Sequence, residues 1–374
     1  MKKNLINATN LHYGGGVQVA VSFINEIISN KQNKDLKNIS IYLSNKVNNS
    51  LLNSNKKAKI FFKCLVHDIY GLNLRSLKFY KSLSEFNTVF TIFGPLYKIH
   101  TPFKSIVGFA QPWIIYPKNE CYKMLPFFLK IKMRLKYYIQ SIFFKRADMI
   151  VVELEHVKKR LEKTLNISAN RICVVHNCVS SIYYEKKLWQ TINVPNFNGY
   201  LRLGYLGRNY FHKNTSIFPK IAKELNKTYN MKVLFYVTFS EQEWKSCSIE
   251  FKEVSVNVGE LKIAQCPHFY KSMDAMIFPS LLECFSSMPL ETMFMKKPLF
   301  ASDRVFNREI CGSFANYFDP LSPIDAANKI SNIFLNKYPK HEDLHKAQEH
   351  AINFSSPKKR AEKYLNLISR LEIT

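Results

Sequence analysis

Two glutamates stand eight positions apart in the stretch LLECFSSMPLETMF (281–294), and the residues between them carry no charge. A carboxylate accepts hydrogen bonds from hydroxyl groups. Glu283 and Glu291 can therefore each bind a different polyhydroxyl group, one a sugar and the other a ribose. This pattern indicates a site for a ligand that has two such groups.

The same stretch predicts the start of a helix. Pro289 fits only an early helical position, which places the first helical residue near Ser287 or Met288. The N–H groups of Ser286, Ser287 and Met288 then have no partner inside the helix and form a site for an anion. We expect Glu291 in the first helical turn, where the helix dipole favours a carboxylate.

Two cations follow a predicted strand at 201–207. Arg208 comes directly after that strand, and Lys213 stands five residues further on, near the next predicted helix. Two cations at the end of one strand can hold a diphosphate from one side. Ordinary solvated surface charge is the alternative interpretation.

A glycine triplet, Gly14 to Gly16, follows the first predicted strand in NLHYGGGVQVAV. Glycines allow a tight turn and a close approach of another group to the backbone. The helix that follows points its unpaired N–H groups at the same place. The triplet does not match the G-x-G-x-x-G dinucleotide pattern, and a plain turn is the alternative.

Short apolar strands alternate with helical patterns along the whole chain. This alternation of continuously apolar strands with helices is typical of parallel sheets covered on both faces. The predicted strands form two series: 3–9, 39–44, 59–65, 87–93, 105–110, 148–153 and 171–176, and then 201–207, 232–238, 255–259, 274–280, 298–302 and 316–320.

The two series predict two doubly wound α/β domains, which also agrees with the length of 374 residues. The polar stretch 180–200 separates them, so we place the domains at 1–185 and 186–354. The last segment, 355–374, reads as a helix in which Ala361, Tyr364, Leu365 and Ile368 form one apolar face.

Composition narrows the possible classes of protein. No apolar run reaches the roughly 18–20 residues of a membrane span, and the N-terminal MKKNLINATN has no apolar block of a signal peptide behind its lysines. The eight cysteines are scattered singly, which suits reduced thiols. Cys173, His176 and Cys178 lie in a strand-like run without a second ligand cluster, so we expect no metal there.

The formal net charge is +26, and residues 1–190 carry most of the excess. Nucleic acid, an anionic membrane surface or phosphorylated substrates could each explain it. An AT-biased genome, which enriches Lys and Asn, is the alternative.

These motifs resemble a known family, the retaining glycosyltransferases of the GT-B fold with an E-x7-E signature (family 4-like). PSLLECFSSMPLETMFMKKPLFASD (279–303) matches that signature, and GRNYFHKN (207–214) matches its G-R-x-x-x-x-K-G. RADMIVVELEHVKKRLEK (146–163), RICVVHNCVS (171–180) and VNVGELKIAQCPHFYKSMDAMIFPS (256–280) resemble further family segments in the same order.

The resemblance implies two Rossmann-like domains around a cleft, with the final helix returning to the N-terminal domain. The N-terminal domain would bind the acceptor, and the C-terminal domain would bind the nucleotide sugar. Glu283 would contact the donor sugar and Glu291 the ribose, with Phe285 beside them. Arg208, Lys213 and the N–H groups of residues 286–288 would hold the diphosphate, and Gly15 and Gly16 would form the N-terminal loop over the donor.

Some positions depart from the family pattern. Cys284 and Ser286 replace glycines, so a ligand must reach the backbone of this loop while both residues keep a negative φ. Many members have a histidine after the fifth N-terminal strand, where this chain has Gln111, which we take as the candidate acceptor-side residue. His12, His67 and His268 read as structural.

The implied reaction moves a hexose or N-acetylhexosamine from a nucleotide sugar, UDP-linked first and GDP-linked second, to a lipid-linked or lipopolysaccharide (O-antigen) saccharide. The sequence has no D-x-D pair, and the cations replace a metal, so we expect no metal and no cofactor. The basic, aromatic segment 121–147 resembles an amphipathic helix that lies on anionic lipid. It predicts a cytoplasmic protein bound peripherally to the inner face of the cytoplasmic membrane, although a core helix with a basic outer face is the alternative.

Two other functions deserve comparison. A GT-B nucleotide-sugar epimerase or phosphorylase would share the fold but lacks this combination of E-x7-E with G-R…K. A nucleic-acid-binding protein would suit the charge, but the chain has no recognised binding module, and the two glutamates would repel a phosphate backbone. We therefore expect a nucleotide-sugar enzyme that does not bind nucleic acid.

Overall fold

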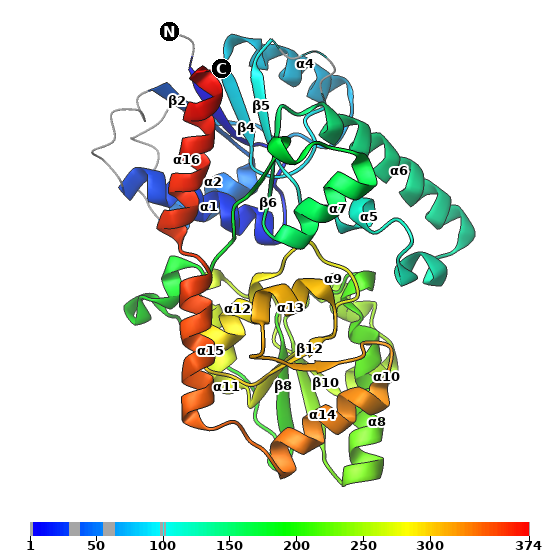
Figure 1. The fold of residues 1–374 in the computed structure, drawn as a ribbon. Coiled ribbons are helices and arrows are strands. Elements are labelled where there is room, and N and C mark those ends of the chain that lie inside the picture. Colours follow the sequence, from blue (N-terminus) through cyan, green and yellow to red (C-terminus); the bar gives the residue numbers. More distant parts are fainter. Residues whose placement is uncertain (1–2, 30–37, 55–63, 98–99, 101, 374) are drawn as a thin grey trace. The chain divides into compact units, whose positions relative to one another are not determined.

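The computed structural model describes residues 3–29, 38–54, 64–97, 100 and 102–373, and it divides into two compact units (Figure 1). The first unit contains Met1–Asn177 and Ser356–Thr374, and the second contains Cys178–Ser355. The division after Asn177 is earlier than our expected boundary at 185. Its physical reason is Tyr183, which is buried and packs its ring against those of Tyr270 and Phe294 in the second unit.

The first unit is built on a seven-stranded sheet in which every neighbouring pair of strands is parallel. The order is β3-β2-β1-β4-β5-β6-β7. The strands are β1 (Asn4–Ala8), β2 (Ile39–Leu43), β3 (Cys64–Val66), β4 (Thr88–Thr91), β5 (Lys104–Gly108), β6 (Met149–Val152) and β7 (Ile172–Val174).

One core of this unit lies between the sheet and three helices, α1 (Gly14–Ser29), α2 (Asn45–Ser54) and α16 (Pro357–Ile373). Figure 1 shows α16, the last helix of the chain, beside α1. Tyr364 of α16 packs between Phe23 and Phe90, with ring centroids 5.0 Å from each. The predicted return of the final helix to the N-terminal domain is confirmed.

The remaining α-helices described in the first unit are α4 (Leu74–Ser82), α5 (Pro112–Ile115), α6 (Phe127–Arg146) and α7 (Glu155–Leu165). Helix α5 contacts both α6 and α7. Helix α7 ends where Asn166 adopts the left-handed conformation, a common way to end a helix.

The second unit is built on a six-stranded parallel sheet of order β10-β9-β8-β11-β12-β13. The strands are β8 (Leu201–Tyr205), β9 (Val233–Val237), β10 (Ser255–Asn257), β11 (Ala275–Phe278), β12 (Leu299–Ser302) and β13 (Asn316–Phe318). Every residue of β9, β11 and β12 is buried, as expected for strands covered on both faces.

Eight α-helices are described in the second unit. Helices α8 and α14 pack together, and Phe218 of α8 stacks on Phe235 of β9 with centroids 4.2 Å apart. Helix α12 packs on α13 and α15. The bounds are α8 (Phe218–Tyr229), α9 (Glu241–Lys245), α10 (Ile249–Glu253), α11 (Cys266–Ser272), α12 (Ser287–Phe294), α13 (Val305–Cys311), α14 (Pro323–Leu335) and α15 (His341–Phe354).

The observed strands overlap all of the predicted ones, and the predicted class, two doubly wound parallel sheets, is confirmed. Most of the predicted strand 59–65 lies outside the described residues, which resume at the start of β3. In each unit the strand order reverses direction next to the first strand, between β1 and β4 and between β8 and β11. Ligands of such sheets bind beyond the carboxyl ends of the strands at these positions.

Candidate active site

The loop after β11 holds Glu283 next to Lys213. The carboxylate Oε1 of Glu283 accepts hydrogen bonds from Lys213 Nζ at 2.5 Å and from the hydroxyl of Ser280 at 2.6 Å. Both charged side chains are largely buried, with exposed fractions of 9% for Glu283 and 16% for Lys213. Within the described residues, no hydrogen bond uses the second oxygen, Oε2. The structure therefore places a fixed carboxylate with one oxygen open to another donor.

The same loop is fixed by bonds to neighbouring segments. Ser302 Oγ donates to the carbonyl of Ser280 at 2.6 Å, and Leu281 N donates to the carbonyl of His212 at 2.8 Å. Asn307 Nδ2 in turn donates to the carbonyl of Ser302 at 2.9 Å. These bonds tie together the segments that follow β8 and β11 and the end of β12, so the position of Glu283 depends on all three. Ser280 belongs to the matched segment PSLLE (279–283), but nothing in the sequence alone assigns it this contact.

Helix α12 begins at Ser287, as predicted, with Ser286 as its N-cap at φ −140°. Neither Cys284 nor Ser286 has positive φ, so the loop reaches the helix without the glycines of the family pattern. Phe285, Ser286 and Ser287 are half-buried. The N–H groups at this helix start have no intrahelical partners and can receive an anion.

Glu291 lies deeper in α12 than expected. It is the fifth residue of the helix, beyond the first turn, so the helix dipole does not account for it, and it is only 6% exposed. Tyr270 donates its hydroxyl to Glu291 Oε2 at 2.8 Å. Burial raises the pKa of the Glu291 carboxyl, against the hydrogen bonds that it accepts. Tyr270 was part of a quoted motif, but only the structure brings it to Glu291.

Arg208 is held by two carboxylates that sequence analysis missed. Its Nε donates to Glu243 at 2.9 Å, and its Nη1 donates to Glu260 at 2.5 Å. Glu243 also accepts from Ser240 in the capping box of α9, a pattern that the letters SEQE at 240–243 do contain. Burial raises the pKa of Glu243, but the hydrogen bonds from Ser240, Asn209 and Arg208 outweigh it and leave that pKa below its ordinary value.

The two predicted cations thus have different partners. Lys213 pairs with Glu283 beside β11, and Arg208 pairs with Glu243 and Glu260. That both hold one diphosphate from one side stays a prediction. The hydroxyl of the buried Tyr205 bonds to the Arg208 carbonyl, and burial, with Glu283 and Glu243 nearby, raises its pKa well above the usual range.

The remaining predicted residues belong to the first unit. Gly15 and Gly16 lie in the first turn of α1 rather than in a loop, because the helix already begins at Gly14, whose φ is +67°. Gln111 follows β5 and is the N-cap residue of α5. That these residues contact a substrate stays a prediction.

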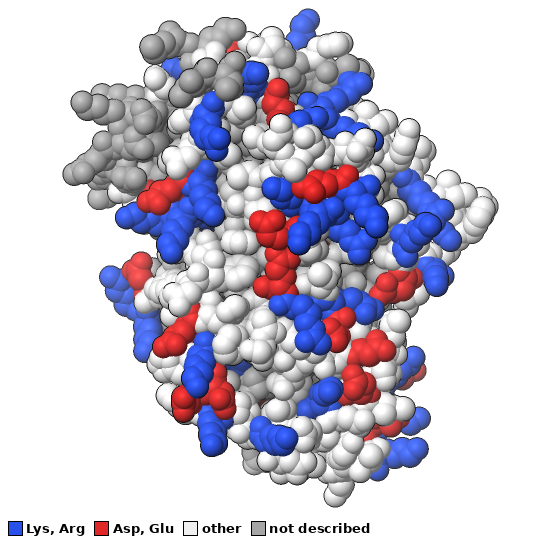
Figure 2. Space-filling model, in the orientation of Figure 1, with Lys and Arg blue, Asp and Glu red and all other residues white. Residues whose placement is uncertain are grey.

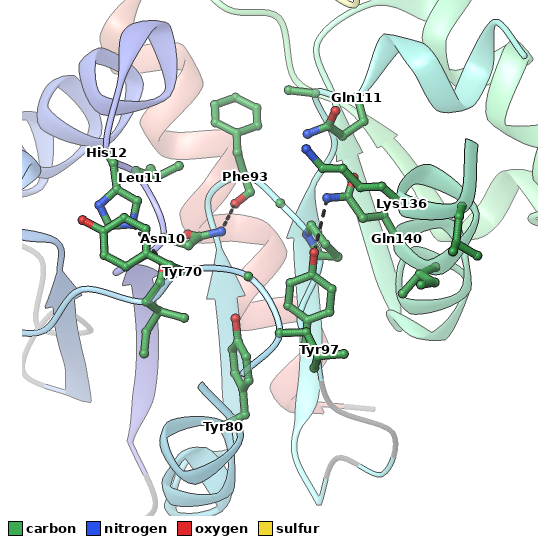
Figure 3. Close-up of a pocket in the computed structure, with 18 of the residues that line it drawn as sticks. Asn10, Leu11, His12, Tyr70, Tyr80, Phe93, Tyr97, Gln111, Lys136 and Gln140 are labelled. Carbon is green, nitrogen blue, oxygen red and sulfur yellow. Dashed lines mark hydrogen bonds between the residues drawn. The ribbon is translucent and has the colours of Figure 1, made fainter. Parts of the chain in front are cut away.

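A pocket of about 680 Å³ opens in the first unit at the carboxyl ends of β1, β3, β4 and β5, with α6 as a further wall (Figure 3). Gln111 lines it, as do His12 and Tyr70, whose rings stack with centroids 4.0 Å apart. His12 Nε2 lies 2.9 Å from the carbonyl of Ile69. His12, which the sequence indicates is structural, stands in the wall of this pocket.

The described residues contain no group of three His, Cys, Asp or Glu side chains that could hold a metal ion. Cys173, Cys247, Cys266 and Cys311 form no disulfide, and Cys173 lies in β7 as part of the sheet.

Solved structures resemble this fold over almost its whole length. A glycosyltransferase from Rickettsia africae is 15% identical, with a TM-score of 0.67 over 99% of this chain and 98% of the other. Anabaena HepE, determined in complex with UDP-glucose, is 13% identical, with a TM-score of 0.69 over 98% of this chain and 99% of the other. Together with the two doubly wound sheets and the returning C-terminal helix, these likenesses define the GT-B fold.

Sequence comparison finds a family match in the second unit. Residues 190–352, nearly all of the second unit, match the family model of glycosyl transferases group 1. The O-antigen chain mannosyltransferase RfbU of Salmonella typhimurium is 25% identical over 207 residues, which is 52% of this chain and 56% of the relative's length. The second unit is therefore similar to the glycosyl transferases of group 1, and the whole chain has the GT-B fold that the E-x7-E resemblance implied.

Proposed function

We propose that this enzyme transfers a hexose or N-acetylhexosamine, with retention, from a nucleotide sugar to a lipid-linked or lipopolysaccharide saccharide. UDP is the favoured nucleotide and GDP the second. The partial match to an O-antigen mannosyltransferase supports the class of acceptor. The UDP-glucose bound to HepE supports the class of donor. In this proposal the second unit binds the donor and the first unit binds the acceptor.

The proposal rests mainly on the hydrogen bonds of the Glu283 carboxylate. Ser280 and Lys213 both bind its Oε1, which leaves Oε2 to accept a hydrogen bond from a sugar hydroxyl. The start of α12 lies four residues later and offers N–H groups to a phosphate. Glu283 and the start of α12 can thus bind a sugar and a phosphate that lie next to each other. Glu291, further along the same helix, binds the ribose in this proposal.

Departure of the diphosphate is the step that needs electrostatic help. The bond between the anomeric carbon and the phosphate oxygen breaks, and negative charge collects on that oxygen. Lys213, Arg208 and the start of α12 stabilise this charge without a metal. The acceptor oxygen bonds to the same face of the sugar, and the departing phosphate takes its proton. No side chain acts as nucleophile, so positioning and charge stabilisation supply the rate.

Arg208 must exchange partners before it can help. Glu260 is 60% exposed, and an ion pair at such a surface is weak. A diphosphate can therefore displace Glu260 while Glu243 keeps the guanidinium in place. In this proposal Gly15 and Gly16 approach the donor, and Gln111 lies on the acceptor side.

We also propose that α6 lies on an anionic membrane. Apolar side chains of this helix are exposed, among them Phe127 (69%), Phe128 (83%) and Tyr138 (66%). Its sequence has six Lys and Arg residues and no acid, and Lys and Arg side chains gather over this part of the unit in Figure 2. A helix that combines exposed apolar and basic side chains is suited to a lipid surface. No helix within the described residues is long and apolar enough to cross a membrane.

The donor assignment is tested by thermal shift with a panel of nucleoside diphosphates. We expect UDP to raise the melting temperature of the wild type more than GDP, ADP or CDP do. Glu291→Ala should weaken every nucleotide, because the ribose contact is common to all. Glu283→Ala should abolish sugar transfer with a milder effect on nucleotide binding.

Glu253→Ala is the matched control, because Glu253 is an exposed glutamate at the end of α10 in the same unit. It should leave both readouts unchanged. Full turnover in Glu283→Ala would refute the role given to that carboxylate.

A further inference from the structure

The pocket of the first unit receives two lysines from α6 and has no carboxylate in its described wall. Lys132 and Lys136 line it, and no carboxylate of the described residues forms an ion pair with either; the Lys136 ammonium lies 5.4 Å from the centre of the Tyr137 ring. The nearby Asp68 accepts from Asn45 N and Nδ2 at 2.9 and 2.6 Å and lies 3.5 Å from Nδ1 of the wall residue His12, so it can offset at most one of the two lysine charges. The lysines therefore leave the pocket with a net positive charge.

The same wall has hydrogen-bond acceptors that lack donors. Asn10 Oδ1 and Gln140 Oε1 are buried, and neither has a partner within the described part of the chain. Their amide nitrogens are used, because Asn10 Nδ2 donates to the carbonyl of Phe93 at 2.7 Å and Gln140 Nε2 donates to Tyr97 at 3.3 Å (Figure 3). A buried acceptor without a donor costs about 1–3 kcal/mol. Hydroxyl groups of a ligand would supply the missing donors.

Aromatic rings complete the pocket on the side opposite to α6. Figure 3 shows Lys136 beside Gln111 and Gln140, and the stacked rings of His12 and Tyr70 across from them. Aromatic faces offer apolar contact area to a ring-shaped ligand. The volume of about 680 Å³ lies in the range of small-molecule sites. A polyhydroxylated ring with an anionic group satisfies the rings, the free acceptors and the lysines together.

We propose that this pocket selects an acceptor saccharide that carries a phosphate or a carboxylate, which Lys132 and Lys136 bind while Asn10 and Gln140 accept hydrogen bonds from its hydroxyls. This inference rests on the proposed function, in which the first unit binds the acceptor. It adds the charge of the acceptor, which the proposed function leaves open.

An anionic lipid headgroup shares this chemistry, because Lys132 and Lys136 belong to the helix that we place on the membrane. The saccharide is the source that the pocket favours, since the free acceptors and the aromatic rings would be unused by a headgroup phosphate alone. The experiment therefore has a soluble arm and a vesicle arm.

In the soluble arm, saturation-transfer NMR measures binding of glucose 6-phosphate, glucuronate and glucose to the full chain. We expect the wild type to bind both anionic sugars about tenfold more tightly than glucose. Lys132→Gln/Lys136→Gln should lose this preference, and Lys132→Arg/Lys136→Arg should keep it. Lys130→Gln/Lys145→Gln removes the same charge from α6 outside the pocket and should bind like the wild type.

Equal binding of glucose and glucose 6-phosphate to the wild type, or equal effects of the two Gln pairs, would overturn the inference. In the vesicle arm, both Gln pairs should reduce sedimentation with phosphatidylglycerol vesicles to a similar extent. Loss confined to the Lys132/Lys136 pair, without a preference for sugar phosphate, would assign the lysines to lipid and overturn it as well. UDP should stabilise all variants equally, and if it stabilises none, the donor assignment fails separately from this inference.

Discussion

Glu283 and Lys213 stabilise each other's charge in a place where neither is well solvated. Their atoms lie 2.5 Å apart, and removal of one would leave the other charge buried and unpaired. The ion pair also fixes the position of both charged groups. Lys213 holds the carboxylate in one orientation, so that Oε2 stays available, and its ammonium remains beside the loop where a phosphate would arrive.

His212, the neighbour of Lys213, predicts a dependence of stability on pH. Burial lowers its pKa to about 4, and Lys213 adds to this effect while Glu283 opposes it. In the unfolded chain the pKa is about 6.5. Between these values the unfolded state binds more protons, so stability falls as the pH drops from about 6.5 to about 4. The loss amounts to about 3 kcal/mol over that window.

Urea unfolding in a Trp113→Phe background measures this, because Trp189 and Trp244 then report the second unit alone. His212→Asn should flatten the decline between pH 6.5 and 4. His341→Asn, an exposed histidine of α15, is the control and should keep it. The same slope in His212→Asn and the wild type would show that another group titrates.

At the scale of elements, α16 is the last helix of the chain, yet it packs into the core of the first unit and should contribute to the stability of that unit. Tyr364 is 2% exposed and contacts Phe23 of α1 and Phe90 of β4. We expect Tyr364→Ala to lower the free energy of unfolding of this unit by about 3–5 kcal/mol, as for other large-to-small changes of aromatic residues.

A test of this prediction needs a spectroscopic probe that reports the unfolding of the first unit alone. In a Trp189→Phe/Trp244→Phe background, the buried Trp113 reports the first unit during urea unfolding. Asn366→Ala, an exposed position on the same helix, should change stability by less than about 0.5 kcal/mol. If both variants unfold at the same urea concentration, α16 is not part of the first unit's cooperative core.

On the scale of the whole molecule, the charge is the dominant property. A net charge of +26 favours binding of the protein to any anionic surface. Helix α6 also has exposed aromatic side chains, which could add apolar contact with lipid to this electrostatic attraction. We expect the protein to sediment with phosphatidylglycerol vesicles at low salt and to be released near 1 M salt, where the Debye length is about 3 Å.

Phe127→Ser/Phe128→Ser separates the two contributions, because it removes apolar contact and leaves the charge unchanged. It should weaken sedimentation at intermediate salt without a change in melting temperature, since both side chains are exposed. Sedimentation that is absent at low salt, or that is insensitive to salt, would contradict the membrane proposal.

The sequence by itself determined the features that depend on neighbouring residues. Continuous apolar runs predicted the strands because both faces of a parallel sheet are buried. Pro289 predicted the start of α12 because a proline needs an early helical position. Glu283 and Arg208 were likewise recognisable as candidate site residues, because each stands in a short motif just after a predicted strand.

The tertiary structure decided which side chains meet. Lys213 and Glu283 are 70 positions apart, and Arg208 and Glu260 are 52 apart, and nothing in the spacing assigns those partners. The pocket of the first unit collects side chains from the segments after four different strands and from two helices, α4 and α6. Local sequence governs backbone conformation, whereas the charge and shape of a site depend on contacts between distant segments, which exist only after the sheets have formed.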